Sequence, residues 1–266
     1  MFIELEYKEY KRVEKYFDKH LYQIPARAVI HGNFPGRVFV DNRENPQIAL
    51  VWAVSRWAYL SYDELLPIHK NFIRDVLNNE IIPVIKKIGE KRFEVYADNN
   101  ISWDNVLKEA MKEYILDKHY ENTFILNKEK FIACTSCLEV PDDIEICENT
   151  FCIIPEEYEK YVEYDVSISN VFGMIIKKKD SIISQCLNNG FIYDNNYFID
   201  LDTFHNGERN KGYGTLISYK LISKMLEKGY SPLWETTTNN LPSQKVADKL
   251  GFEKVNEYPV YSISGF

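Results

Sequence analysis

Long hydrophobic runs are missing from this chain of 266 residues. Its longest strongly apolar stretch, residues 48–54, is far shorter than the roughly 20 residues that a membrane-spanning helix needs. Residues 1–20 carry charges throughout and contain no apolar segment of the kind found in secretory signal peptides. We therefore expect a cytoplasmic protein with no membrane partner.

An excess of basic residues is also missing. Lys and Arg number 32 against 40 Asp and Glu, so the net charge is −8 and the pI is near 5.3. This balance argues against a general nucleic-acid or anionic-membrane binder. The hydrophobic fraction of 45% is ample for a packed core, and the length allows one large or two ordinary domains.

Cysteines are few and odd in number. Four of the five form the pattern CxxC-x9-C-x4-C at Cys134, Cys137, Cys147 and Cys152. This pattern could be mistaken for a zinc site, but the spacing of the second pair is loose and its surroundings resemble strands. We expect free thiols in a reducing compartment and no metal.

The most informative stretch is residues 196–225. Alternating side chains over residues 198–203 predict a strand with two distinct faces. The loop Arg-Asn-Lys-Gly-Tyr-Gly follows at residues 209–214. Helical spacing then relates Tyr213, Ile217, Leu221 and Met225.

A glycine loop that opens a helix exposes backbone N–H groups at the positive end of the helix dipole, where phosphate oxygens bind. Gly212 and Gly214 would let a pyrophosphate approach closely, and Arg209 and Lys211 could add charge-assisted contacts. An ordinary turn is the alternative, because RxxGxG alone is a weak signal. The loop lacks the GK[ST] of a P-loop and the third glycine of a dinucleotide fingerprint.

The residues after this helix point to a family. Residues 231–236 read as a second strand, and Asn239 and Asn240 lead into a helix that ends on Gly251-Phe252. This order resembles the GCN5-related N-acetyltransferase (GNAT) superfamily: strand, R/QxxGxG/A, helix, strand, and an Asn-led helix ending in GF. The resemblance covers roughly residues 172–252.

Within that superfamily, the chain looks most like the branch of the zwittermicin A resistance acetyltransferase. The residues that carry this likeness are Trp234, Glu235, Asn240, Ser243 and residues 246–252. The resemblance implies an α/β (α+β) GNAT acyl-CoA N-acyltransferase fold, with a mixed, mostly antiparallel sheet flanked by helices. It also implies acetyl-CoA (coenzyme A) as the cofactor and a small-molecule amine as the substrate.

The resemblance assigns cofactor binding to two regions. The first comprises the strand end and the loop: Asp202, Thr203, Phe204, Arg209, Asn210, Lys211, Gly212, Tyr213, Gly214 and Thr215. The second comprises Asn240 and Ser243, for which helix capping is an alternative and compatible role.

A general base must accept a proton from the acceptor ammonium. Many family members carry Glu where this chain has Phe198. Asp200, two residues along the same strand face, is the first candidate and Glu235 is the second. A solvated strand face is the alternative for Asp200, as it is for Asp202.

A general acid is not evident. The tyrosine that many GNAT enzymes place seven residues after the matched Asn is Ala247 here. Tyr258 or Tyr261 could substitute, and the alternative is that no dedicated acid is needed, because a thiol leaves readily. Cys186 could be proposed as an acyl carrier, but a lone strand cysteine is more often a core residue.

Element order suggests that the chain holds two GNAT-like halves, a degenerate domain at residues 1–128 and a catalytic domain at 129–266. We expect a cofactor only in the second half, and a monomer or a homodimer. The predicted helices are 4–20, 63–88, 102–115 and 155–170, and the predicted strands are 26–31, 37–40, 47–59, 93–97, 121–126, 131–135, 171–178 and 181–192.

The predicted function is acetylation of a primary amine on a small molecule, such as an aminopolyol antibiotic or a metabolite. One alternative is a protein or peptide N-acetyltransferase with an open, extended cleft. A second alternative is an acyl-CoA-binding sensor or pseudoenzyme, because Phe198 and Ala247 stand at the two catalytic positions.

Overall fold

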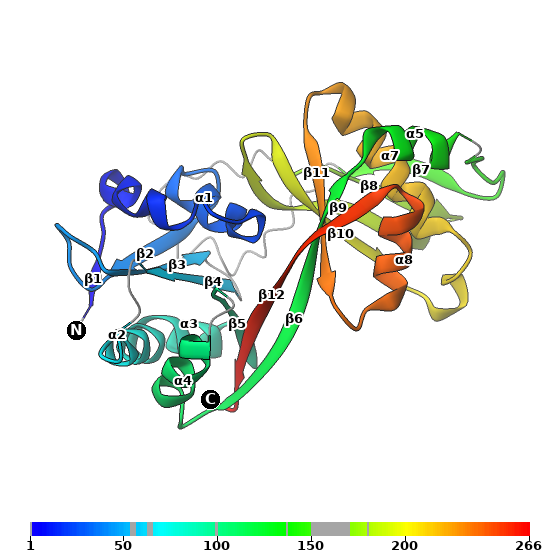
Figure 1. Cartoon of the computed structure of the whole chain (residues 1–266). Coiled ribbons are helices and arrows are strands. Elements are labelled where there is room, and N and C mark those ends of the chain that lie inside the picture. The colour runs from blue at the N-terminus through cyan, green and yellow to red at the C-terminus, as the bar shows by residue number, and fades with distance from the viewer. Residues whose placement is uncertain are drawn as a thin grey trace. The chain divides into compact units, whose positions relative to one another are not determined.

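The computed structural model describes residues 2–53, 57–62, 66–98, 101–136, 138–149, 171–179 and 181–266. The described chain divides into two compact units (Figure 1). Unit 1 contains residues 2–121 and 258–266, and unit 2 contains residues 122–149 and 171–257. The division falls inside two strands, and the last residues of the chain belong to unit 1. A simple cut between residues 128 and 129 does not describe this return of the chain.

Unit 1 is built on a mixed sheet in the order β1-β2-β3-β4-β5-β12, with β6 next to β12. The pair β4–β5 is parallel, whereas the pairs β1–β2, β2–β3, β3–β4 and β5–β12 are antiparallel. Its elements are β1 (Ile3–Glu4), η1 (Tyr7–Tyr16), η2 (Leu21–Gln23), α1 (Ile24–Ile30), β2 (Gly36–Val40), β3 (Ile48–Ala53), β4 (Trp57–Tyr62), α2 (His69–Val76), η3 (Leu77–Ile81), α3 (Ile82–Lys87), β5 (Arg92–Tyr96), α4 (Ile101–Ala110) and parts of β6 (Ile115–Leu126) and β12 (Phe252–Ser264).

Three predictions in unit 1 are wrong. The strand predicted at residues 47–59 comprises parts of two antiparallel strands, β3 and β4. Residues 26–31 were expected to form a strand because Val and Ile are common there, but they lie in α1 and the turn that follows it. Pro25 occupies the first turn of α1, where its missing N–H costs nothing, so it starts a helix rather than ending one. The helix predicted at residues 4–20 is the shorter 3-10 helix η1.

Unit 2 is a mixed sheet in the order β6-β11-β10-β9-β8-β7, in which β10 and β11 run parallel. The long helix α7 packs on β8, β9, β10 and β11, and its apolar side chains share one core with theirs. The further elements of unit 2 are α5 (Lys128–Thr135), β7 (Glu145–Asn149), β8 (Gly173–Lys178), β9 (Ser181–Tyr193), β10 (Asn196–Thr203), η4 (Asn206–Glu208), α7 (Tyr213–Glu227), β11 (Ser231–Thr237) and α8 (Leu241–Lys249).

Most of the predicted elements of unit 2 are confirmed, including the β8–β9 hairpin and the series β10, α7, β11, α8. The strand predicted at residues 131–135 is wrong, because this segment belongs to helix α5. The Asn127 side chain caps that helix by accepting a hydrogen bond from the Lys130 N–H at 3.1 Å. The helix predicted at residues 155–170 lies outside the described residues.

The parallel strands of unit 2 separate after a short ladder. The β10–β11 ladder ends at the pair Phe198–Leu233, although both strands continue within the described chain to Thr203 and Thr237. Opposite Phe198, β9 carries an irregularity with Gly190 at φ +88°. A bulge of this kind bends and twists its strand pair, so it accounts for a change in the direction of β10 where the ladder ends.

Candidate active site

The loop before α7 has the conformation of an anion-binding turn. Asn210 and Gly212 have positive φ values of 62° and 86°. Gly212 is the N-cap of α7, and because it has no side chain, no cap accepts hydrogen bonds from the first turn. The N–H groups at the start of this 15-residue helix therefore remain available to an anion.

The second glycine of the loop has a packing role. An added Cβ at Gly214 would lie 3.3 Å from Leu201 Cδ2 on β10, closer than most real Cβ contacts. Glycine therefore lets the first turn of α7 lie directly against the end of β10. The Arg209 side chain also ties the loop to this strand, because its Nε donates to the Thr203 carbonyl at 3.2 Å.

At the end of β10, some backbone N–H and C=O groups point toward β9 and the others point away from it. The Phe204 N–H donates to Ile183 O, and the Asp202 carbonyl accepts from Ser184 Oγ, so these two backbone groups face β9. Backbone groups alternate in direction along a strand. Those of Leu201 and Thr203 therefore point toward the side that β11 has left. The Thr203 carbonyl accepts from Arg209 there, and the Leu201 groups and the Thr203 N–H could bind an extended ligand as an added strand would.

A cavity of about 800 Å³ lies against this strand end, the loop and α8. Its lining is Leu201, Asp202, Thr203, Glu208, Arg209, Asn210, Gly212, Tyr213, Gly214, Thr215, Asn240, Pro242, Ser243, Lys245, Val246 and Lys249. The structure thus brings together all the residues predicted to bind the cofactor except Phe204 and Lys211. The Phe204 N–H is engaged with β9, and the Lys211 ammonium lies 3.0 Å from Glu208 Oε2.

Helix α8 forms the wall of the cavity opposite the loop. Asn240 caps it, with its Oδ1 accepting from the Ser243 N–H at 3.2 Å, and the buried Trp234 Nε1 donates to Ser243 Oγ at 3.0 Å. The predicted capping role of Asn240 is confirmed, and the side chain also lines the cavity. Sequence reasoning missed Lys245 and Lys249, which i+3 and i+7 spacing from Pro242 could have placed on this wall.

The two candidate bases lie outside the cavity lining. Ile199 and Trp234 belong to the core beneath α7, so their neighbours Asp200 and Glu235 lie on the opposite face of β10 and β11. Asp200 is exposed and Glu235 is half-buried. Phe198, where many relatives carry Glu, is buried on that same face. The two carboxylates thus lie two residues past the last strand pair, on the side away from α7.

The alternative acid and nucleophile candidates are engaged elsewhere. Cys186 is fully buried with its Sγ 3.5 Å from Ser218 Oγ, and burial raises the pKa of its thiol to about 12, which suits a core residue. Tyr258 and Tyr261 lie in unit 1, both buried. Burial, together with the hydrogen bond to Asp104, raises the pKa of Tyr261.

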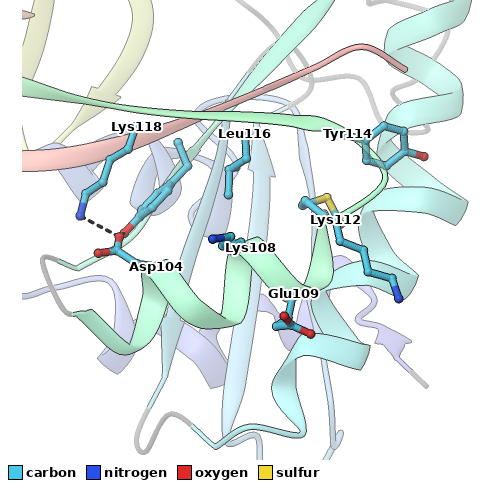
Figure 2. Close-up of a pocket in the computed structure, with 9 residues that line it drawn as sticks. Asp104, Lys108, Glu109, Lys112, Tyr114, Leu116 and Lys118 are labelled. Atoms are coloured by element: carbon cyan, nitrogen blue, oxygen red, sulfur yellow. Dashed lines mark hydrogen bonds and ion pairs between the residues drawn. The ribbon is translucent and has the colours of Figure 1, made fainter.

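Unit 1 contains a second, smaller cavity of about 520 Å³ between α4 and β6 (Figure 2). Two of its charged groups pair: Lys118 Nζ lies 2.7 Å from Asp104 Oδ1, and the Tyr261 hydroxyl donates to the same oxygen at 2.7 Å. No glycine lines this cavity. It therefore lacks the close-approach loop that distinguishes the cavity of unit 2.

Neither a metal site nor a membrane span is found in the described part of the chain. There, no three His, Cys, Asp or Glu side chains converge, and no helix is long and apolar enough to cross a membrane. Cys134 and Cys147 are free thiols. Cys137 and Cys152, the other members of the cysteine pattern, lie outside the described residues.

Parallel strands that separate, a glycine loop at the start of a long helix, and an Asn-capped helix across the cavity together define a GNAT-type acyltransferase unit. The model of the GNAT acetyltransferase family matches residues 14–261. The chain belongs to this family and is an acyltransferase.

Individual proteins resemble the chain over nearly its whole length. An uncharacterized N-acetyltransferase of Bacillus subtilis, YdfB, is 24% identical over 267 residues, which covers 97% of both proteins. A GCN5-related N-acetyltransferase-like protein from Streptococcus suis superposes with a TM-score of 0.68 at 20% identity, covering 96% of this chain and 98% of that one.

A tandem GNAT protein from the clavulanic acid biosynthesis pathway superposes with a TM-score of 0.62 at 11% identity, covering 100% of this chain and 99% of that one. This likeness, together with the repeated element order, supports the predicted architecture of two GNAT-like halves. The more specific likeness to the zwittermicin A resistance branch stays a prediction.

Proposed function

We propose that unit 2 binds acetyl-CoA in the cavity beside α7 and transfers the acetyl group to a primary amine of a small molecule. The observation that carries this proposal is the cavity itself, in which the free N–H groups of the α7 start and the open edge of β10 face one space. Acetyl-CoA is long, with phosphates at one end and amides along its pantetheine arm. The loop offers partners for the phosphates and the strand edge offers partners for the amides.

The residues of the loop and strand would hold the donor in a fixed direction. Backbone N–H groups at Gly212 to Thr215 would bind the pyrophosphate, and the Arg209 guanidinium would add a positive charge beside it. The backbone groups of Leu201 and the Thr203 N–H would pair with the pantetheine amides. Acetyl-CoA supplies a thioester, whose C–S bond breaks as the new C–N bond forms.

The carboxylates on the other face of the sheet would act on the acceptor. An amine is protonated at neutral pH and must lose a proton before it can attack. Asp200, or Glu235 in its place, would accept this proton directly or through water, while the thiolate leaves without a dedicated acid. Because both carboxylates lie away from α7, the acceptor would reach the thioester through the opening between β10 and β11.

A thiol-release assay with acetyl-CoA and a panel of amines tests this function. Aminopolyols, other small primary amines and peptides with free amino ends form the three arms. Turnover with a small amine supports the proposal, and turnover confined to peptides would replace it with protein or peptide acetylation. Tight acetyl-CoA binding without turnover of any amine would instead favour an acyl-CoA-binding sensor or pseudoenzyme.

A further inference from the structure

The wall of the cavity opposite the glycine loop carries two lysines with no assigned role. Lys245 and Lys249 both line the cavity and are exposed on α8. They are four residues apart, so their side chains share one face of the helix with Cβ atoms about 6 Å apart. The cavity therefore has a cationic wall in addition to its phosphate-binding loop.

These two lysines differ from five other lysines of unit 2 in their pairing. Lys130, Lys178, Lys211, Lys224 and Lys254 each form an ion pair with a carboxylate. Within the described residues, Lys245 and Lys249 form no such pair. Two uncompensated ammonium groups that face one cavity create a site for an anion with about two negative charges.

The position of the lysines along α8 matches the polarity of a coenzyme A molecule. Asn240 and Ser243 lie at the start of the helix, next to Trp234 of β11, and Lys245 and Lys249 lie about 8 Å and about 14 Å beyond Asn240 at 1.5 Å per residue. The wall is thus neutral near the separating strands and cationic at the far end. Coenzyme A is likewise neutral along its pantetheine arm and anionic at its nucleotide end.

We propose that Lys245 and Lys249 bind the 3′-phosphate of the adenosine in coenzyme A, an inference that rests on the proposed function of unit 2. The pyrophosphate is a diester with one charge per phosphorus, and the loop with Arg209 accommodates it. A phosphomonoester carries about −1.5 to −2 charges at pH 7 and three acceptor oxygens, which suits two ammonium donors. The lysine pair therefore selects free coenzyme A thioesters over donors that lack this phosphate, such as phosphopantetheine on a carrier protein.

Calorimetric binding of CoA and of 3′-dephospho-CoA to the full chain, at low ionic strength, tests this inference. The wild type should bind CoA at least tenfold more tightly than dephospho-CoA. Lys245→Gln/Lys249→Gln should abolish that difference by weakening CoA alone. Lys228→Gln, an exposed lysine at the end of α7, is the matched control and should keep the difference.

The experiment distinguishes failure of the lysine assignment from failure of the proposed function of unit 2. If the wild type binds both ligands equally tightly, the role of the lysines is wrong while the cofactor site of unit 2 stands. If the double variant weakens both ligands by the same factor, the lysines contact the pyrophosphate and the inference is also overturned. If the wild type binds neither ligand, the proposed function itself fails.

Discussion

Each unit contains a short parallel strand pair, and the two pairs differ in the segment that follows the first strand. In unit 1, β4 and β5 pair at Trp57–Tyr59 and Glu94–Tyr96, as β10 and β11 pair in unit 2 over three residues each. After β4 the chain continues Asp-Glu-Leu-Leu-Pro-Ile, without glycine, whereas after β10 it carries the glycine loop. The glycine loop, rather than the shared strand arrangement, distinguishes the unit with the larger cavity.

In unit 1, residues of the N-terminal segment contact the C-terminal ends of β4 and β5. The Ser61 hydroxyl on β4 donates to the Tyr16 carbonyl at 2.8 Å, and the Tyr22 hydroxyl donates to Asp98 Oδ1, just past β5, at 2.7 Å. Tyr22 also stacks on Tyr258 with ring centroids 4.3 Å apart. The strand pair of unit 1 is therefore held by internal contacts, whereas in unit 2 the corresponding end of β10 borders the cavity in which we propose that acetyl-CoA binds.

Among the variants that test this comparison, Asp200→Asn should have the largest effect, which is on kcat. We expect kcat to fall about 100-fold or more, because the variant loses the proposed general base. The affinity for acetyl-CoA should stay unchanged, since Asp200 does not line the cavity. Steady-state kinetics with calorimetry measures both, and Asp248→Asn, an exposed carboxylate on α8, serves as the control. An unchanged kcat would move the base to Glu235 or to water.

Tyr22→Phe tests whether the contacts at the strand ends of unit 1 stabilise the fold without taking part in binding. Removal of the hydroxyl leaves the Asp98 carboxylate without this donor, and we expect a loss of about 1.5–3 kcal/mol in the free energy of unfolding. Acetyl-CoA affinity should not change. Denaturant unfolding and ligand titration of the same variant measure the two quantities. A large loss of affinity with little loss of stability would show that unit 1 takes part in binding.

Asn240 variants separate its two roles. Asn240→Ala should cost about 1 kcal/mol of stability because α8 loses its N-cap, and Asn240→Asp should restore that stability. If the side chain also binds the cofactor through its amide N–H₂, Asn240→Asp should still bind acetyl-CoA more weakly than the wild type. Normal affinity in Asn240→Asp would leave capping as its sole role.

The smallest expected effect is a pH dependence in unit 1. The hydrogen bond that His119 Nε2 donates to Glu121 Oε1, 3.5 Å away, raises the pKa of His119. The stabilisation that the His119–Glu121 interaction gives the folded protein is thus complete below the unfolded-state His pKa of about 6.5. It is lost as pH rises through the higher pKa of His119 in the folded protein. The melting temperatures of wild type and His119→Gln should differ most near pH 5.5 and converge near pH 8.5. A difference that is constant with pH would contradict this interpretation.

Local signals in the sequence predicted the series β10, α7, β11 and α8, because strand alternation, the glycine loop and the Asn240 cap are all short-range features. Other local signals were present and misread. Pro25 starts α1, and Asn127 caps α5. In both segments the β-branched and aromatic residues favoured a strand, whereas the helix-start signal decided the outcome.

Long-range features could not be predicted in the same way. The return of residues 258–266 to unit 1 depends on the pairing of β12 with β5, more than 150 residues earlier in the chain. The direction of the Phe204 N–H depends on the register between β10 and β9, including the irregularity near Gly190. Such contacts are set by the sheet as a whole, and a single sequence does not encode them as a pattern.

Thermal stabilisation by acetyl-CoA, in the wild type and in two glycine variants, tests the central claim most directly. Gly212 and Gly229 have φ values of +86° and +83°, and an added Cβ would meet no atom within 4 Å at either position. Gly212→Trp and Gly229→Trp should therefore lose similar stability from backbone strain, but only Gly212 lines the cavity.

At a ligand concentration of about 100 times Kd, the wild type and Gly229→Trp should each gain about 2.7 kcal/mol, seen as a rise of several degrees in melting temperature. Gly212→Trp should gain nothing. An equal rise in all three proteins would place the cofactor elsewhere, and no rise in the wild type would contradict acetyl-CoA binding by unit 2.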